Sequence, residues 1–151
     1  MRWYRDLDAL YRFLPEGISE NDNNPALLAV ARGTKPEIGK FWWEATKGAS
    51  KDSDLAVCLL WMLAFAKRPL LCQVGAADKD QAAELLKAAK DVLYLNPWLA
   101  KRVRIQSWQI LCDATSSSAE IIAADVAGSH GARPDVLVIN ELSVSAMRFG
   151  R

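Results

Sequence analysis

The sequence contains few of the residues that usually mark metal, disulfide or acid–base chemistry. It has one histidine among 151 residues, and its three cysteines, Cys58, Cys72 and Cys112, stand singly inside apolar runs. This spacing indicates neither a disulfide framework nor a zinc site, so we expect reduced thiols in the core. No apolar run is long enough to span a bilayer, and the charged start of the chain does not resemble a signal peptide. We therefore expect a cytoplasmic protein with no membrane partner.

An excess of charge of one sign is also missing. Lysine and arginine number 19 and aspartate and glutamate 18, which leaves a net charge of +1 and no global signal for nucleic-acid binding. The basic cluster of Lys101, Arg102 and Arg104 is more typical of a solvated edge than of a phosphate site. With 51% hydrophobic residues, the composition is that of a soluble globular domain.

The rest of the chain is organised around residues 41–54, where an aromatic run meets a loop of small residues that contains the two lysines Lys47 and Lys51. A phosphate-binding loop has the pattern G/A-x-x-x-x-G-K-S/T, in which backbone N–H groups and the lysine hold the phosphates and the hydroxyl holds Mg²⁺. Here Ser50 replaces the second glycine and Asp52 replaces the hydroxyl. The pattern falls on Ala45, Thr46, Lys47, Gly48, Ala49, Ser50, Lys51 and Asp52.

The flanking segments favour such a loop. Residues 40–44 can form a buried strand and residues 55–66 an apolar helix, so the helix would begin against a bound anion. The alternative is an ordinary solvated turn in which Asp52 or Asp54 caps the helix.

We divide the chain into an N-terminal helical segment, residues 1–38, and a partial P-loop ATPase-like domain, residues 39–151. In the first segment, residues 25–32 form a short helix that ends at Gly33. Earlier in this segment, aromatic residues near the N-terminus could stack on an adenine ring, but aromatic residues at helical spacing more often belong to the core. An amphipathic helix is predicted there by an apolar stripe at helical spacing. Its members are Trp3, Leu7, Leu10, Tyr11 and Leu14.

The second segment alternates strands and helices, which predicts an α/β fold with a mostly parallel sheet. Residues 70–74 read as a buried strand, and Asp78 with Gln81 forms a capping box for a helix that ends near Asn96. Residues 102–124 predict an antiparallel excursion, with residues 115–119 as its turn. Residues 136–139 predict a central strand that ends at Asn140 and Glu141, where ligands bind in open α/β sheets.

Three segments together resemble the ATPase domain of phage large terminases: residues 45–56 (ATKGASKDSDLA), 73–82 (QVGAADKDQA) and 124–143 (ADVAGSHGARPDVLVINELS). The most specific piece is the turn of Ser129, His130 and Gly131, which leads through Arg133 and Pro134 into a strand with an acidic end. His130 carries no assigned chemistry, because a lone histidine in a turn is more often structural.

The resemblance implies a P-loop ATPase that binds ATP and Mg²⁺ and packages viral double-stranded DNA with a portal and a small subunit, as a ring of copies. It implies that Lys51 contacts the β and γ phosphates and that Glu141 orients the attacking water. Asn140 would stand in the second shell of the metal, and Ser53 would replace the lost hydroxyl ligand. We expect the sheet to be incomplete and the nuclease domain to be absent from these residues. Two other readings remain: a catalytically inactive terminase remnant that binds protein, and another P-loop enzyme of helicase-like type.

Overall fold

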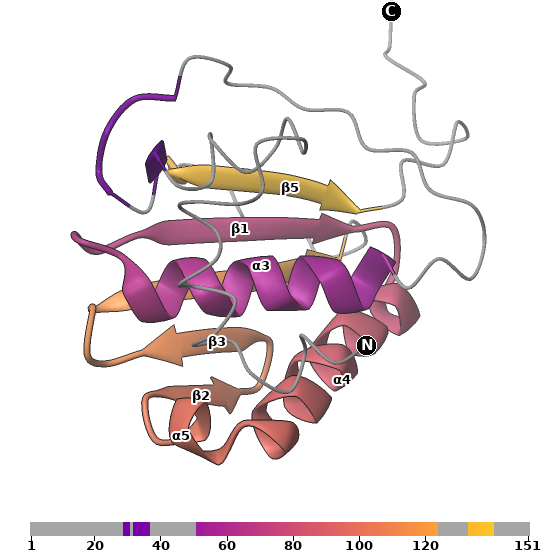
Figure 1. Ribbon diagram of the computed structural model, residues 1–151. Coiled ribbons are helices and arrows are strands. Elements are labelled where there is room, and N and C mark those ends of the chain that lie inside the picture. The colour runs from indigo at the N-terminus through magenta and orange to yellow at the C-terminus, as the bar shows by residue number, and fades with distance from the viewer. Residues whose placement is uncertain (1–28, 31, 37–50, 124–132, 141–151) are drawn as a thin grey trace, which may run out of the picture.

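The computed structural model describes residues 29–30, 32–36, 51–123 and 133–140, and all structural statements below refer to these (Figure 1). Ala29 and Val30 are helical. The predicted helix over residues 3–14 and the predicted strand over residues 40–44 lie outside the described residues, and so does the division of the chain at residue 38. The later elements are α3 (Lys51–Phe65), β1 (Leu71–Ala76), α4 (Lys79–Leu95), α5 (Pro97–Ala100), β2 (Val103–Gln106), β3 (Gln109–Cys112), β4 (Ser117–Ala123) and β5 (Val136–Asn140).

The strands form one sheet in the order β2-β3-β4-β1-β5. β1 pairs in parallel with β4 on one side and β5 on the other. β2 pairs with β3, and β3 with β4, in the antiparallel sense. The predicted α/β class and the antiparallel excursion are therefore confirmed. The described sheet is mixed, because the excursion supplies half of its pairings.

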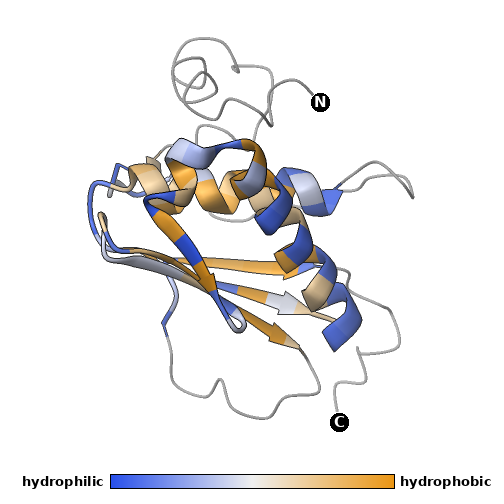
Figure 2. Cartoon of the chain, turned by 90° about the horizontal axis from the view of Figure 1, so that it is seen from below, coloured by the Kyte–Doolittle hydropathy of each residue, from blue (hydrophilic) through white to orange (hydrophobic). Residues whose placement is uncertain are grey.

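Two helices, α3 and α4, cover the same face of this sheet (Figure 2). α3 is apolar all round and buries eight residues from Ala56 to Ala64, as expected of a helix inside a core. α4 is amphipathic and turns a stripe from Ala82 to Leu93 toward the same core. The sheet contributes the residues that alternate toward these helices, such as Val74 and Ile121. The predicted helix over residues 55–66 is confirmed, and it begins four residues earlier.

The sequence predicted that β5 is a central strand, but among the described strands it lies at the edge of the sheet. Its Val136 and Val138 pack against the core, whereas Leu137 and Ile139 are 60% and 56% exposed on the opposite face. A run of apolar residues indicates that a strand has a buried face, but it does not report how many neighbouring strands it has.

The predicted turn over residues 115–119 is also misplaced. The chain turns over residues 113–116, and β4 begins at Ser117, which is buried. Ser117 enters the strand because its hydroxyl accepts a hydrogen bond from the Leu70 N–H at 3.0 Å. Thr115 similarly donates to the Leu63 carbonyl at 2.6 Å. Polar side chains that favour turns are tolerated in the core when backbone groups satisfy them.

The beginning and end of α4 follow the sequence. Asp78 is the N-cap, and its Oδ1 accepts a hydrogen bond from the Gln81 N–H at 2.8 Å. Asn96 ends the helix, and its Nδ2 donates to the Val92 carbonyl at 2.8 Å. The sequence did not predict α5, which Pro97 starts at the helix position where proline is best tolerated.

At the amino ends of β1 and β5, three segments are joined by Arg68. Its Nη2 donates to Asp135 Oδ1 at 2.7 Å, and Asp135 Oδ2 accepts the Leu71 N–H at 2.9 Å. The arginine side chain also lies beside Gly33, where an added Cβ would stand 3.3 Å from Arg68 Cδ. Gly33 has a φ of 77° and ends the preceding helix as predicted, with Thr34 N–H donating to the Ala29 carbonyl. This contact anchors the chain directly before β5, the strand that ends at Asn140.

Candidate functional site

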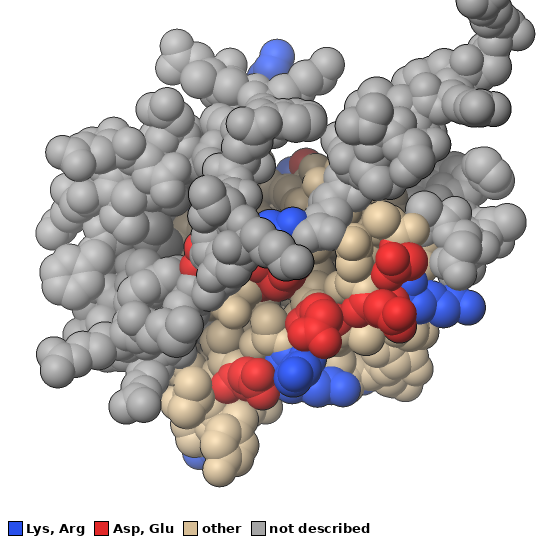
Figure 3. Space-filling view, turned by 90° about the vertical axis from the view of Figure 1, so that its right-hand side faces the viewer, with Lys and Arg blue, Asp and Glu red and all other residues tan. Residues whose placement is uncertain are grey.

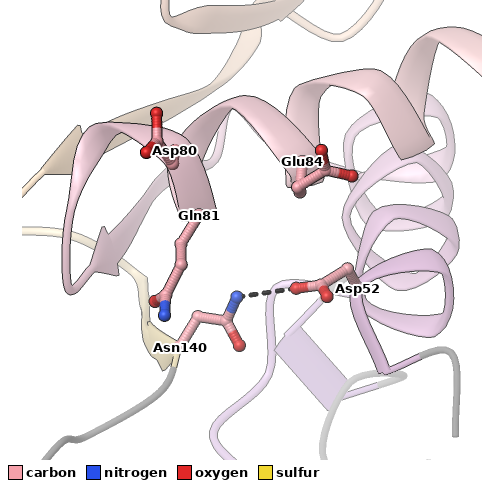
Figure 4. A pocket seen from close by; sticks show the side chains of 5 residues that line it. All are labelled: Asp52, Asp80, Gln81, Glu84 and Asn140. Carbon is pink, nitrogen blue, oxygen red and sulfur yellow. Dashed lines mark hydrogen bonds between the residues drawn. The ribbon is translucent and has the colours of Figure 1, made fainter. Parts of the chain in front are cut away.

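The carboxyl ends of β1 and β5 face the amino ends of α3 and α4, and a hollow of about 240 Å³ lies between them (Figure 4). This is the edge of an open α/β sheet at which ligands bind. The helix amino ends add partial positive charge and backbone N–H groups. The side chains that line the hollow are Asp52, Asp80, Gln81, Glu84 and Asn140.

The central contact of the hollow joins two residues that the sequence analysis placed in separate motifs. Asn140 Nδ2 donates a hydrogen bond to Asp52 Oδ1 at 2.8 Å, across 88 positions of the chain. Asp52 lies in the first turn of α3, and Asn140 is the last residue of β5 and is buried. The end of the predicted phosphate loop and the end of the predicted acidic strand therefore meet at one place.

Two other predicted site residues, Lys51 and Ser53, flank Asp52 in the first turn of α3. Both are half-buried, and neither lines the hollow. The remaining predicted site residues lie outside the described residues: Ala45, Thr46, Lys47, Gly48, Ala49, Ser50 and Glu141, together with the family-motif residue His130.

Sequence reasoning missed the acidic character of the hollow. Asp80 and Glu84 come from the first two turns of α4, four positions apart on one helix face. Figure 3 looks onto this side of the molecule, where acidic side chains gather over the described surface with basic ones between them. The signal was present, since a helix that follows a parallel strand places the polar residues of its first turns at the ligand-binding edge.

Gln81 has a different position from the one its spacing suggested. As the third residue of α4 it was assigned to the capping box, and its backbone N–H does bind Asp78. Its side chain, however, lines the hollow and extends toward Asn140, whereas Asp80 points away from that pair (Figure 4). The Oε1 atom of Gln81 is shielded from solvent. The backbone cap thus fixes the position of a carboxamide in the candidate site.

Burial changes the acid–base properties of two groups of α3 close to the hollow, Asp54 and Cys58. Desolvation raises the pKa of Asp54 above its ordinary value of 3.8. The pKa of the Cys58 thiol is raised to about 11, mainly by burial and secondarily by the charge of Asp54. A thiol with so high a pKa is a poor nucleophile at neutral pH, so Cys58 is not a candidate for covalent chemistry.

The donor set of the hollow is compatible with a magnesium ion that is carried by a phosphate. Within the described residues, no group of three or more histidine, cysteine, aspartate or glutamate residues is arranged to hold a metal. Mg²⁺ does not need such a group, because it keeps several waters and usually takes one or two carboxylates together with substrate phosphates. Asp52 would supply one such carboxylate, and the amide oxygen of Asn140, whose Nδ2 donates to Asp52, would be a further oxygen ligand.

No model of a known protein family matches the chain, and no curated protein matches it either. Among solved structures, it is similar to the HK97 bacteriophage large terminase, with a TM-score of 0.58 and 21% sequence identity over 64% of the chain. The two chains share a fold over the matched part. The matched part spans only 21% of the length of the HK97 protein. The comparison thus supports the resemblance read from the sequence at the level of the terminase-like fold. In the described part of the chain, no helix is both long and apolar enough to cross a membrane.

Proposed function

We propose that this chain is a nucleotide-binding domain of terminase type, related to the ATPase part of a phage or prophage DNA-packaging motor. The observation that carries the proposal is the hydrogen bond of 2.8 Å between Asn140 and Asp52. It joins the two sequence motifs that a P-loop enzyme must bring together, and it lies at the ligand-binding edge of the terminase-like sheet.

The proposed roles follow the two motifs. The backbone of Gly48, Ala49 and Ser50 cradles the phosphates of ATP, and Lys51 contacts the β and γ phosphates. Ala45, Thr46 and Lys47 form the first part of this loop. When bound, Mg²⁺ neutralises charge on the β and γ phosphate oxygens. Asp52 and Asn140 would hold the ion, with Ser53 as the neighbouring hydroxyl.

Glu141 is the proposed catalytic residue, because it follows Asn140 directly at the end of β5. In this role its carboxylate orients a water molecule for attack on the terminal phosphate. The sequence places it next to the residue that contacts the helix start, which supports this assignment.

The charge of the hollow limits how the nucleotide can bind. Asp52, Asp80 and Glu84 would repel an unshielded polyphosphate. Binding therefore depends on Lys51, on the helix amino ends and on the accompanying cation, and we expect nucleotide affinity to require Mg²⁺.

A second candidate function is that of an inactive terminase remnant that binds protein. The same acidic lining favours it, and so does the hydrogen bond to Asp52 that already uses one of the two amide N–H donors of Asn140. The remnant would keep the fold without the chemistry.

The partners proposed for the active form are double-stranded viral DNA, a portal, a small terminase subunit and further copies of this chain. The proposed location is the cytoplasm of the bacterial host. We infer these partners and this location from the terminase resemblance.

The test is calorimetric titration of the purified chain with ATP in the presence and absence of Mg²⁺. We expect binding that requires Mg²⁺, is lost in Lys51→Ala and is kept in Lys90→Ala, an exposed lysine on α4. Unchanged affinity in Lys51→Ala would exclude the site assignment. Absence of binding by the folded wild-type chain would favour the remnant, whereas turnover that disappears in Glu141→Gln would exclude the remnant.

A further inference from the structure

Gln81 stands apart from the other side chains of the hollow in its chemistry. Three of the five lining residues are acids, and an ionised carboxylate only accepts hydrogen bonds. The two carboxamides, Asn140 and Gln81, contribute N–H donors, and Asn140 already gives one to Asp52. Among the lining residues, Gln81 is therefore the second neutral group that can donate to an anionic oxygen.

The position of Gln81 is fixed by the backbone around it. It lies in the first turn of α4, five residues after the end of β1, and Asp78 holds its N–H at 2.8 Å. From there its side chain extends toward Asn140 at the end of the neighbouring strand β5 (Figure 4). A side chain held on the first turn of a long helix is positioned more rigidly than one on a loop.

The part of the nucleotide that Gln81 would meet follows from its neighbours. The lysine of a phosphate loop reaches the β and γ phosphates, and the residues at the end of the acidic strand face the metal and the attacking water. Because Gln81 faces that strand end, it would lie on the side of the terminal phosphate of a nucleotide bound at the proposed site.

We propose that Gln81 is a specificity-determining residue that contacts the terminal phosphoryl group, so that a nucleoside triphosphate binds more tightly than a diphosphate. This inference rests on the proposed nucleotide site. Its carboxamide donates to a γ-phosphate oxygen or to the water beside it, a role that a glutamine side chain can fill in P-loop enzymes. A diphosphate lacks the group that Gln81 would contact.

The experiment compares the affinities of the full chain for ATP and ADP, both with Mg²⁺, in the wild type, Gln81→Ala and Gln81→Glu. Loss of a hydrogen bond to a charged group corresponds to roughly a ten- to hundredfold weakening of ATP binding. We expect that loss in Gln81→Ala with ADP affinity nearly unchanged, and a larger loss in Gln81→Glu, which adds a fourth carboxylate. Alanine keeps the backbone cap and favours the helix, so the variant is expected to fold, as circular dichroism would verify.

Gln109→Ala is the matched control, because Gln109 is an exposed glutamine that does not line the hollow. It should leave both affinities unchanged. If wild-type protein binds nucleotide but Gln81→Ala weakens ATP and ADP equally, or neither, the role of Gln81 is excluded and the nucleotide site stands. If the wild type binds neither nucleotide, both proposals fail together.

Discussion

Asn140 at the end of β5 donates its hydrogen bond to Asp52 at the start of α3, at a distance of 2.8 Å. In the usual P-loop arrangement the strand supplies the carboxylate and the helix start supplies a hydroxyl. Here the carboxylate stands on the helix and the neutral group on the strand. The pair keeps one negative charge and one hydrogen bond, so under the proposed assignment the two residues would exchange roles and preserve the contact between strand and helix, although neither matches the motif.

Replacing Asn140 by aspartate tests whether the carboxylate of Asp52 and the carboxamide of Asn140 have exchanged positions relative to the usual motif. Without Mg²⁺, Asn140→Asp should lower the free energy of unfolding by about 1–3 kcal/mol, because the hydrogen bond becomes a contact between two carboxylates. With Mg²⁺ the two carboxylates can share the cation, so the midpoint of thermal unfolding should rise more in the variant than in the wild type. Thermal scans with EDTA and with Mg²⁺ measure both effects.

Asn140→Ala is the control for this prediction, since it removes the hydrogen bond and adds no charge. It should lose stability without gaining a response to Mg²⁺. An equal response to Mg²⁺ in all three proteins would mean that Asp52 and position 140 do not share an ion.

Stability should depend on pH through Asp135. The hydrogen bond from Arg68, together with the Leu71 N–H, holds the pKa of Asp135 below its ordinary value of 3.8, and burial opposes this shift. A depressed folded pKa means that the unfolded chain takes up the proton first as the pH falls. The stabilisation is therefore present above about pH 3.8 and is lost as the pH falls through the folded pKa.

Urea titrations at pH 6 and across the acid range measure this effect. We expect Asp135→Asn to be less stable than the wild type at pH 6 and to lose less stability on acidification. Asp91→Asn, an exposed aspartate on α4, is the matched control. If Asp135→Asn kept the acid sensitivity of the wild type, the ion pair with Arg68 would not contribute to it.

The cap of α4 gives a further prediction. Asp78→Ala removes the acceptor of the Gln81 N–H and should lower the free energy of unfolding by about 1 kcal/mol. Asp78→Ser should retain most of the stability, because serine is also a good N-cap. Equilibrium unfolding in urea compares the three proteins, and equal stability of the alanine and serine variants would mean that the cap does not stabilise α4.

These elements also show how far the sequence predicts the molecule. The apolar run of α3 and the Asp78–Gln81 spacing of α4 predicted their helices because both signals are local. The turn at residues 115–119 was misplaced because Ser117 accepts a hydrogen bond from the backbone N–H of Leu70, just before β1 and 47 positions away. The edge position of β5 was missed for a related reason, since strand order depends on pairings that periodicity does not encode.

The residues of the candidate site were likewise predicted only in part. Asp52 and Asn140 could be nominated from the sequence because each stands at a recognisable junction of strand, loop and helix. Asp80 and Glu84 were not, because acidic residues are common on the exposed face of a helix, and their position in the first turns after a parallel strand was not used as a signal. The direction of the Gln81 side chain likewise depends on the position of β5.

The exposed face of β5 provides the last prediction. Ile139 is 56% exposed, whereas its neighbour Val138 packs against the core. Threonine keeps the β-branched shape that strands favour, so substitution tests burial rather than strand propensity. We expect Ile139→Thr to change the free energy of unfolding by no more than about 0.5 kcal/mol. Val138→Thr, which places a hydroxyl against the core in a partly buried position, should cost about 1–3 kcal/mol. Chemical denaturation of both variants decides the matter: if Ile139→Thr cost as much as Val138→Thr, the outer face of β5 would be covered in the folded protein, and the side chain of Ile139 would belong to a second core.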